Sequence, residues 1–300
     1  MHLGNSVICP VTGIPMLFAA GAAIYYSYKK GKTEFKKENI LPFCLLTAFV
    51  FALQMVNFSI PYTGSSGHII GSTLLAILLG PNLALLSISL ILTVQCLFFN
   101  DGGLLALGCN IFNMGVLACF VIYPFIYKPL KERKMELLGA FLASIFALEL
   151  GSIGVLAEAY LSNSTANILN FASFMLFIHL AIGIFEGLFT SLMVSLVQKF
   201  GLSNKIKASI FSLTLILSLI ISNYASTKPD GLEWSLIKIS DSFIAQTNGI
   251  IYNLSETIQE KTAILLNLPD ILANLSGIIL ITLFAFLLSK ILIHKPKWTN

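Results

Sequence analysis

The chain has 300 residues, of which 56% are hydrophobic and only 11% are charged. Soluble domains carry roughly 25% charged residues, so the composition excludes that class and indicates an integral membrane protein built from α-helices. The net charge of +4 does not indicate a nucleic-acid-binding protein.

Continuous apolar runs, rather than the alternating pattern of a membrane β-barrel, make up most of the chain. We therefore expect an all-α membrane protein with about nine transmembrane helices. The five cysteines are scattered without a CxxC motif, and they are predicted to be small buried apolar residues rather than disulfides or a zinc site. The predicted runs cover residues 11–28, 41–58, 68–79, 82–99, 104–127, 137–158, 169–198, 207–226 and 274–293.

The basic residues gather in short stretches between these runs. Such stretches face the cytoplasm, and all of them agree only if each of the nine runs crosses the membrane. This arrangement predicts an N-terminus on the outer side of a multi-pass protein of the cell membrane, with an outer loop over residues 227–273. The clusters are Lys29–Lys37, Lys128–Lys134, Lys199–Lys207 and Lys290–Lys297.

The shortest of the predicted runs covers residues 68–79. A helix of this length reaches about 18 Å, well short of a hydrocarbon core of about 30 Å. We expect a short buried crossing that begins near His68, with Ser65 and Ser66 as N-caps, and breaks at Gly80-Pro81. His68 would then be recessed from the outer face.

The sequence begins Met-His, which is a potential metal chelate. The free amine of Met1 and the amide nitrogen of His2 close a five-membered ring on a metal, and that amide with His2 Nδ1 closes a six-membered ring. His68 could supply the fourth nitrogen of a square, a geometry that suits Ni(II) or Cu(II). On the two histidines alone, the alternative is that His2 is incidental and His68 is a packed polar residue.

Further polar residues in the apolar runs have two interpretations each, because such residues are usually functional or paired. Gln54 and Asn57 could orient His68 by hydrogen bonds, with Ser66 beside them, or could pack helices together. Asn110 and Asn113 could line the same outer cavity or join helices.

Two more polar residues lie deeper and are not predicted as metal ligands. His179 and Glu186 lie two turns apart on one helix face, where they could pair with polar groups of neighbouring helices or contact a coupling subunit. In the outer loop, Asp230 and Glu233 could attract cations or, more simply, stabilise a turn at Pro229-Asp230-Gly231.

Several motifs in this order resemble a known family. The stretches QMVNFSIPYTGSSGHIIGS (54–72), LGPNLALLSISLILTVQCLFFNDGGLLALGCNIFNMG (79–115) and IHLAIGIFEGLFT (178–190), with the Met-His start, are similar to CbiM/NikM substrate-binding subunits of energy-coupling factor transporters for cobalt and nickel. The stretch KPDGLEWSL (228–236) resembles the PDGLE motif of the CbiN/NikN partner. The chain thus resembles a fusion of a CbiM/NikM-like domain (1–200) and a CbiN/NikN-like region (201–300).

This resemblance implies a substrate-capture subunit for Ni(II) or Co(II), with Met1, His2 and His68 as metal ligands. It also implies separate ATPase subunits and a transmembrane coupling subunit as partners. The start Leu3-Gly4-Asn5 departs from the common family pattern, which has an acidic residue near position 5. The alternatives are a subunit for an organic micronutrient, with His68 only a pocket residue, and an intramembrane enzyme or scaffold. The chain lacks the Walker motif GxxxxGK[ST], so ATP hydrolysis is expected in the partners.

Overall fold

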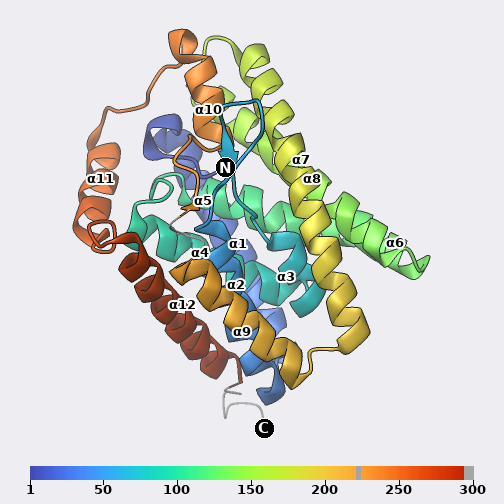
Figure 1. The fold of residues 1–300 in the computed structure, drawn as a ribbon. Coiled ribbons are helices and arrows are strands. Elements are labelled where there is room, and N and C mark those ends of the chain that lie inside the picture. Colours follow the sequence, from blue (N-terminus) through green and yellow to red (C-terminus); the bar gives the residue numbers. More distant parts are fainter. Residues whose placement is uncertain (221–223, 294–300) are drawn as a thin grey trace.

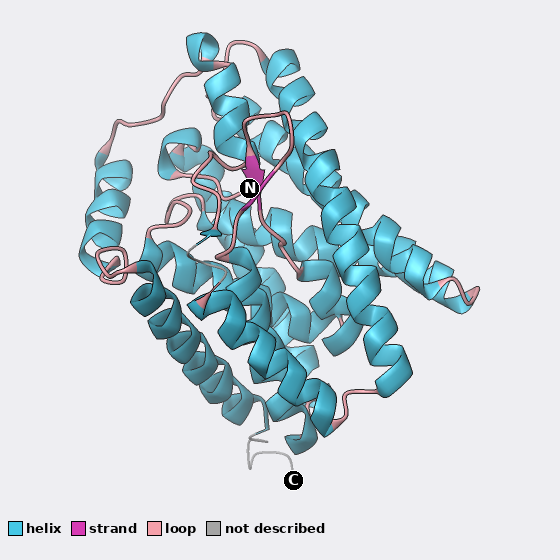
Figure 2. Ribbon diagram, in the orientation of Figure 1, coloured by secondary structure: helices cyan, strands magenta, loops and turns pink. Residues whose placement is uncertain are grey.

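The structure, a computed structural model, describes residues 1–220 and 224–293 (Figure 1). Helices make up most of the described chain, and one short two-stranded hairpin interrupts them (Figure 2). The prediction of a mostly helical membrane protein is therefore confirmed. Residues 221–223 of the predicted run 207–226, and Lys295 and Lys297 of the last basic cluster, lie outside the described residues.

The helices follow the predicted apolar runs closely. One long rod, Leu107–Glu132, consists of α5 (Leu107–Ile111), a π-helical segment (Phe112–Tyr127) and α6 (Lys128–Glu132). The other helices are α1 (Pro10–Glu34), α2 (Ile40–Gln54), α3 (Ser72–Leu79), α4 (Pro81–Phe99), α7 (Glu136–Leu161), α8 (Ile168–Phe200), α9 (Asn204–Leu219), α10 (Gly231–Lys238), α11 (Ile250–Thr262) and α12 (Asp270–Ile293).

Within the described ranges, six helical segments are long and apolar enough to cross a membrane. The helices α1, α3 and α9, which correspond to three further predicted runs, are not among these six. The count of nine crossings and the outer position of the N-terminus therefore stay predictions. The six segments are Lys37–Gln54, Pro81–Phe99, Leu107–Glu132, Glu136–Leu161, Ile168–Phe200 and Asp270–Ile293.

One apolar core runs through the bundle, where α7 packs along α8 and along the π-helical segment. A second, smaller cluster joins Phe35 after α1, Phe43 of α2 and Leu292 of α12. The ends of α1 and α12 therefore meet at one end of the molecule, and the charge pattern predicts this arrangement for two of the basic clusters. The five cysteines, all within the described ranges, are unpaired, and four of them are buried.

The expected helix start at His68 is wrong. Strand β1 (Phe58–Ser59) pairs antiparallel with β2 (Ser66–Gly67), and His68 directly follows this hairpin. Helix α3 begins only at Ser72, after Gly71 with φ of +75°. This left-handed conformation favours glycine, and it ends the extended segment that carries His68.

Candidate metal-binding site

Met1, His2 and His68 lie together although 66 residues separate the two histidines in the printed sequence. The imidazole rings of His2 and His68 stack with centroids 5.2 Å apart and planes inclined by 22°. Met1 and His68 are only 4% and 6% exposed. The three residues that the sequence pattern groups together are therefore neighbours in the structure. Their role as metal ligands stays a prediction.

Three of the four predicted donor groups have a protein partner in this arrangement. The Met1 ammonium forms an ion pair with Asp230 Oδ2 at 2.8 Å, and His2 Nδ1 lies 3.2 Å from Asp101 Oδ1. The third group, His68 Nδ1, lies 3.2 Å from Asn57 Oδ1. Among the described residues, the buried Nε2 atoms of both imidazoles have no hydrogen-bond partner. The Met1 amine and His2 Nδ1 therefore lie beside carboxylates, His68 Nδ1 lies beside an amide oxygen, and the Nε2 atoms of both rings are unpaired among the described residues.

The backbone of Leu3, directly after His2, is held by hydrogen bonds to the Asn110 side chain and to Gly103. Asn110 Oδ1 accepts from Leu3 N at 2.8 Å, and Asn110 Nδ2 donates to Leu3 O at 3.1 Å. Gly103 N also donates to Leu3 O, at 2.7 Å. A Cβ at Gly102, where φ is +82°, would lie 2.9 Å from Asn110 Nδ2. Asn110 is therefore a positioning residue for the N-terminal segment rather than only a helix-joining residue.

Asn110 lines neither cavity at the site, whereas Asn113 has one of its two predicted roles, that of joining helices. Its Nδ2 donates to Glu158 Oε2 on α7 at 2.7 Å, so this residue joins two helices. A Cβ at Gly154 would meet the Asn113 side chain at 2.2 Å, which shows how closely α7 packs there. Asn113 does not line the cavity that contains His2 and His68.

The prediction that Ser65 and Ser66 cap a helix is also wrong. Ser66 N donates to Pro229 O at 2.8 Å, and Ser66 Oγ donates to Lys228 O at 2.7 Å. Ser65 Oγ lies within 3.3 Å of the same Pro229 carbonyl. Because the serines belong to the hairpin rather than to α3, their polar groups bind the segment that leads to Asp230.

Two side chains from different helices fix the backbone beyond His68. Glu186 of α8 accepts from Ile70 N at 2.9 Å and from Gly71 N at 3.0 Å. Gln54 at the end of α2 donates to Ile70 O at 2.6 Å. Glu186 therefore binds the main chain just before α3, rather than a polar group of a neighbouring helix as expected. Gln54 acts on this backbone instead of on the His68 ring.

His179 on α8 packs against Gly231, at the start of α10 in the PDGLE segment (228–236). Its Nδ1 lies 2.8 Å from Met175 O within α8, and its ring carbon Cε1 would lie 3.0 Å from a Cβ at Gly231. Glycine at this position lets α10 sit directly on α8. Asp230, the N-cap of α10, forms a capping box with Glu233, so it stabilises a turn as predicted and also contacts the N-terminal amine.

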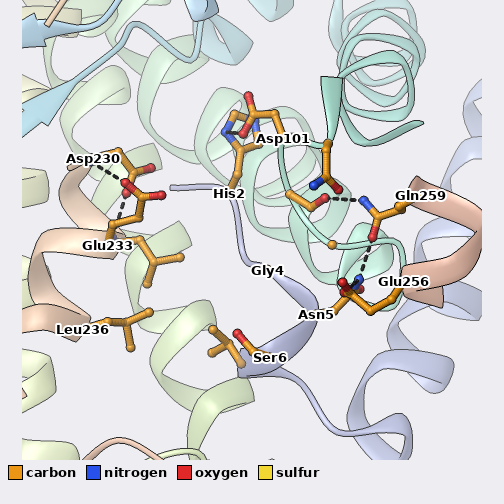
Figure 3. Close-up of a pocket in the computed structure, with 15 residues that line it drawn as sticks. His2, Gly4, Asn5, Ser6, Asp101, Asp230, Glu233, Leu236, Glu256 and Gln259 are labelled. Carbon is orange, nitrogen blue, oxygen red and sulfur yellow. Dashed lines mark hydrogen bonds and ion pairs between the residues drawn. The ribbon is translucent and has the colours of Figure 1, made fainter. Parts of the chain in front are cut away.

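A cavity of about 190 Å³ lies at this site and contains His2, His68, Asp101, Asp230 and Glu233. A second cavity of about 320 Å³ adjoins it, also lined by His2 and the same three carboxylates (Figure 3). The charges suit a cation, because three carboxylates surround two imidazoles. Within the described residues, no group of three or more His, Cys, Asp or Glu side chains is arranged to hold a metal.

The surroundings lower the pKa values of both His2 and Asp230, but for different reasons. Burial lowers the pKa of His2 below its ordinary value, although the nearby Asp101 carboxylate opposes this shift. Burial alone would raise the pKa of Asp230, but the charge and hydrogen bond of the Met1 ammonium hold it well below the usual range. Asp230 is therefore ionised at neutral pH, and His2 is mostly neutral.

Sequence reasoning missed four polar residues that hold the N-terminal segment. Asp101 binds His2, and Asn5 binds Glu256 and Gln259 from α11. Asn5 also accepts from Leu105 N at 2.8 Å. The departure at position 5 is visible in the sequence, but the partners of Asn5 lie 100 to 254 residues away, and no local pattern indicates them.

These observations define a multi-helical membrane protein with an acidic cavity beside its N-terminal segment. Its residues 2–203 match the family described as cobalt uptake substrate-specific transmembrane region (CbiM), and residues 204–294 match the PDGLE domain. The chain therefore belongs to the CbiM family and carries a fused PDGLE domain, which confirms the resemblance found in the sequence.

Named relatives agree with this assignment. The cobalt transport protein CbiM of Lachnoclostridium phytofermentans is 32% identical over 232 residues, which are 72% of this chain and 87% of that protein. The fused nickel transport protein NikMN of Rhodobacter capsulatus is 36% identical over 122 residues, or 40% of this chain. This match spans only 35% of the Rhodobacter protein, and another spans 40% of a relative from Archaeoglobus fulgidus.

Solved structures also resemble this chain. A crystal structure described as a transition metal transporter is 33% identical and has a TM-score of 0.60. The match covers 71% of this chain and 99% of the chain in that crystal structure. A truncated transition metal transporter is 34% identical, with a TM-score of 0.59 over 66% of this chain.

Proposed function

We propose that this chain captures Ni(II) or Co(II) for an ATP-driven energy-coupling factor transporter in the cell membrane of a bacterium or archaeon. The observation that carries the proposal is the convergence of the Met1 amine and the imidazoles of His2 and His68 beside an acidic cavity. The family match and the names of the relatives support the same substrate class.

The ligands follow from chelate chemistry. The Met1 amine, the His2 amide nitrogen and His2 Nδ1 form adjacent five- and six-membered rings around one ion, and an imidazole nitrogen of His68 completes a square. Metal capture then requires the amine to leave Asp230 and His2 Nδ1 to leave Asp101, because both are engaged without metal. The Met1 ammonium and the His2 amide each lose a proton on binding, while the two imidazoles bind as neutral ligands, so protons are released.

The surroundings support this exchange. His68 lies four residues before α3 begins, so the positive end of that helix dipole does not act directly on the ion; the dipole effect falls off within one turn. Asp101, Asp230 and Glu233 line the cavity, where their charge attracts a divalent cation. Transport itself is proposed to need two ATPase subunits and a membrane coupling subunit, since the chain has no Walker motif.

An N-terminal extension tests this proposal. A Gly-Ser-Gly-Ser-Gly-Ser extension before Met1 moves the amine away from the chelate and leaves both histidines in the chain, whereas a single added residue would create a new X-X-His chelate with the same square geometry. The proposal expects nickel and cobalt capture to be lost in a chain that keeps its helical circular dichroism, although loss of the Met1–Asp230 ion pair lowers its thermal stability. The matched control is the native N-terminus, verified by mass spectrometry. Full metal capture by the extended chain would contradict the proposal, and binding of an organic micronutrient by both forms would favour the alternative substrate class.

A further inference from the structure

Helix α11 has three distinct faces. Ser255 and Gln259 are buried against the protein, being 7% and 2% exposed. The side chains of Ile250, Leu254 and Ile258, spaced by four residues, form one exposed apolar strip, and they are 87%, 57% and 38% exposed. A separate exposed strip is polar and consists of Asn253, Thr257 and Glu260. An amphipathic helix of this kind is typical of a lipid–water interface.

The position of α11 agrees with such an interface. Gln259 Nε2 donates to Cys96 O at 3.1 Å, and Leu265 N donates to Phe98 O at 3.1 Å. Both carbonyls belong to the last turn of α4, which is one of the membrane-spanning candidates and ends at Phe99. The C-terminal half of α11 therefore lies level with the end of a transmembrane helix.

The apolar strip continues into a surface that faces lipid. Figure 1 shows α11 at the edge of the molecule, beside the start of α12. Between them, Ile264 and Leu266 are 62% and 58% exposed, and Ile279 on the spanning helix α12 is 69% exposed. Apolar side chains are thus exposed from α11 through the connecting segment to α12.

We propose that α11 is a membrane-interface helix, with the strip Ile250–Leu254–Ile258 inserted among the lipid acyl chains. The bilayer is the occupant because the strip is continuous with the exposed side of α12, and because the neighbouring strip of α11 is polar and suits water.

This placement links the bilayer to the N-terminal segment. Gln259 Oε1 accepts from Asn5 Nδ2 at 2.6 Å, and Glu256 Oε1 accepts from the same amide at 2.5 Å (Figure 3). Gln259 Nε2 also donates to Gly102 O at 2.8 Å. The depth of α11 in the interface therefore fixes the depth of the segment that begins with Met1 and His2.

A fluorescent reporter on each strip tests the lipid contact. In the full chain with Trp234→Phe and Trp298→Phe, one variant carries Leu254→Trp on the apolar strip and a matched variant carries Asn253→Trp on the polar strip. Both are reconstituted in phosphatidylcholine vesicles with acyl chains brominated near the headgroup. A third variant, Ile279→Trp on α12, serves as the positive control for lipid contact.

The proposal expects the brominated lipid to quench Leu254→Trp several-fold more strongly than Asn253→Trp, and aqueous iodide to quench them in the opposite order. Equal quenching of both by iodide would place the strip in water and overturn the proposal. Protection of Leu254→Trp from both quenchers would show that protein covers the strip, which also overturns it. Neither outcome depends on metal binding, so this test is independent of the proposed transport function.

Discussion

Replacing Glu186 should loosen the turn that presents His68. In Glu186→Ala, the backbone N–H groups of Ile70 and Gly71 lose their acceptor in a buried place. Each unsatisfied buried donor costs about 1–3 kcal/mol, so the two together cost about 2–6 kcal/mol. Glu186→Gln keeps one acceptor oxygen and should cost about half as much.

Only part of this energy appears in metal affinity, because the turn can also relax with metal bound. Partners that orient a metal ligand typically contribute 10–100-fold to affinity, and we expect a loss in affinity of about that size for Glu186→Ala. The effect for Glu186→Gln should be smaller. Equilibrium dialysis against nickel, followed by elemental analysis of the purified full chain, measures both.

The matched control is Glu149→Gln on α7. The Oε1 atom of Glu149 has no hydrogen-bond partner within the described part of the chain, and its side chain does not hold the turn. This variant should bind nickel as tightly as the parent. Unchanged affinity in Glu186→Ala, or an equal loss in Glu149→Gln, would refute the conclusion that Glu186 positions His68.

Three further perturbations test the contacts around the site. Asn110→Ala removes the hydrogen bonds that hold the N-terminal segment and should lower nickel affinity by about 10–100-fold, while Asn113→Ala should leave it nearly unchanged; equal losses on dialysis would contradict this. Gly231→Ala pushes α10 from α8 and should speed limited proteolysis of the PDGLE segment, whereas Gly21→Ala, whose Cβ meets nothing within 4 Å, should not. Asp230→Asn removes the ionic partner of the N-terminal amine, so acylation of that amine, followed by mass spectrometry, should become several-fold faster; an unchanged rate would show that the ion pair does not shield it.

The helices could be predicted from the sequence because the hydrophobic effect of the bilayer acts on whole runs of residues. The exact start of α3 could not. Gly71 and the pairing of β1 with β2 set it, and both depend on tertiary contacts that the apolar pattern of residues 68–79 does not contain.

The two histidines and the amine could be grouped from chelate chemistry and motif order, but the residues that hold them could not. The Asp230–Met1 contact spans 229 residues of chain, and the Asn5–Gln259 contact spans 254. Such pairs have no local signal. By contrast, the spacing of Ile250, Leu254 and Ile258 is a local signal of an amphipathic helix, which lies within the predicted outer loop 227–273.

The central claim is that one metal ion binds to the Met1 amine, His2 and His68. The measurement that tests it most directly is the metal content of the purified chain with a mass-verified native N-terminus, beside His2→Ala and His68→Ala. The account predicts about one nickel or cobalt ion per chain, a stoichiometry set by the single chelate, and loss of the ion in both variants. No metal in the parent chain, or full metal content in both variants, would contradict it.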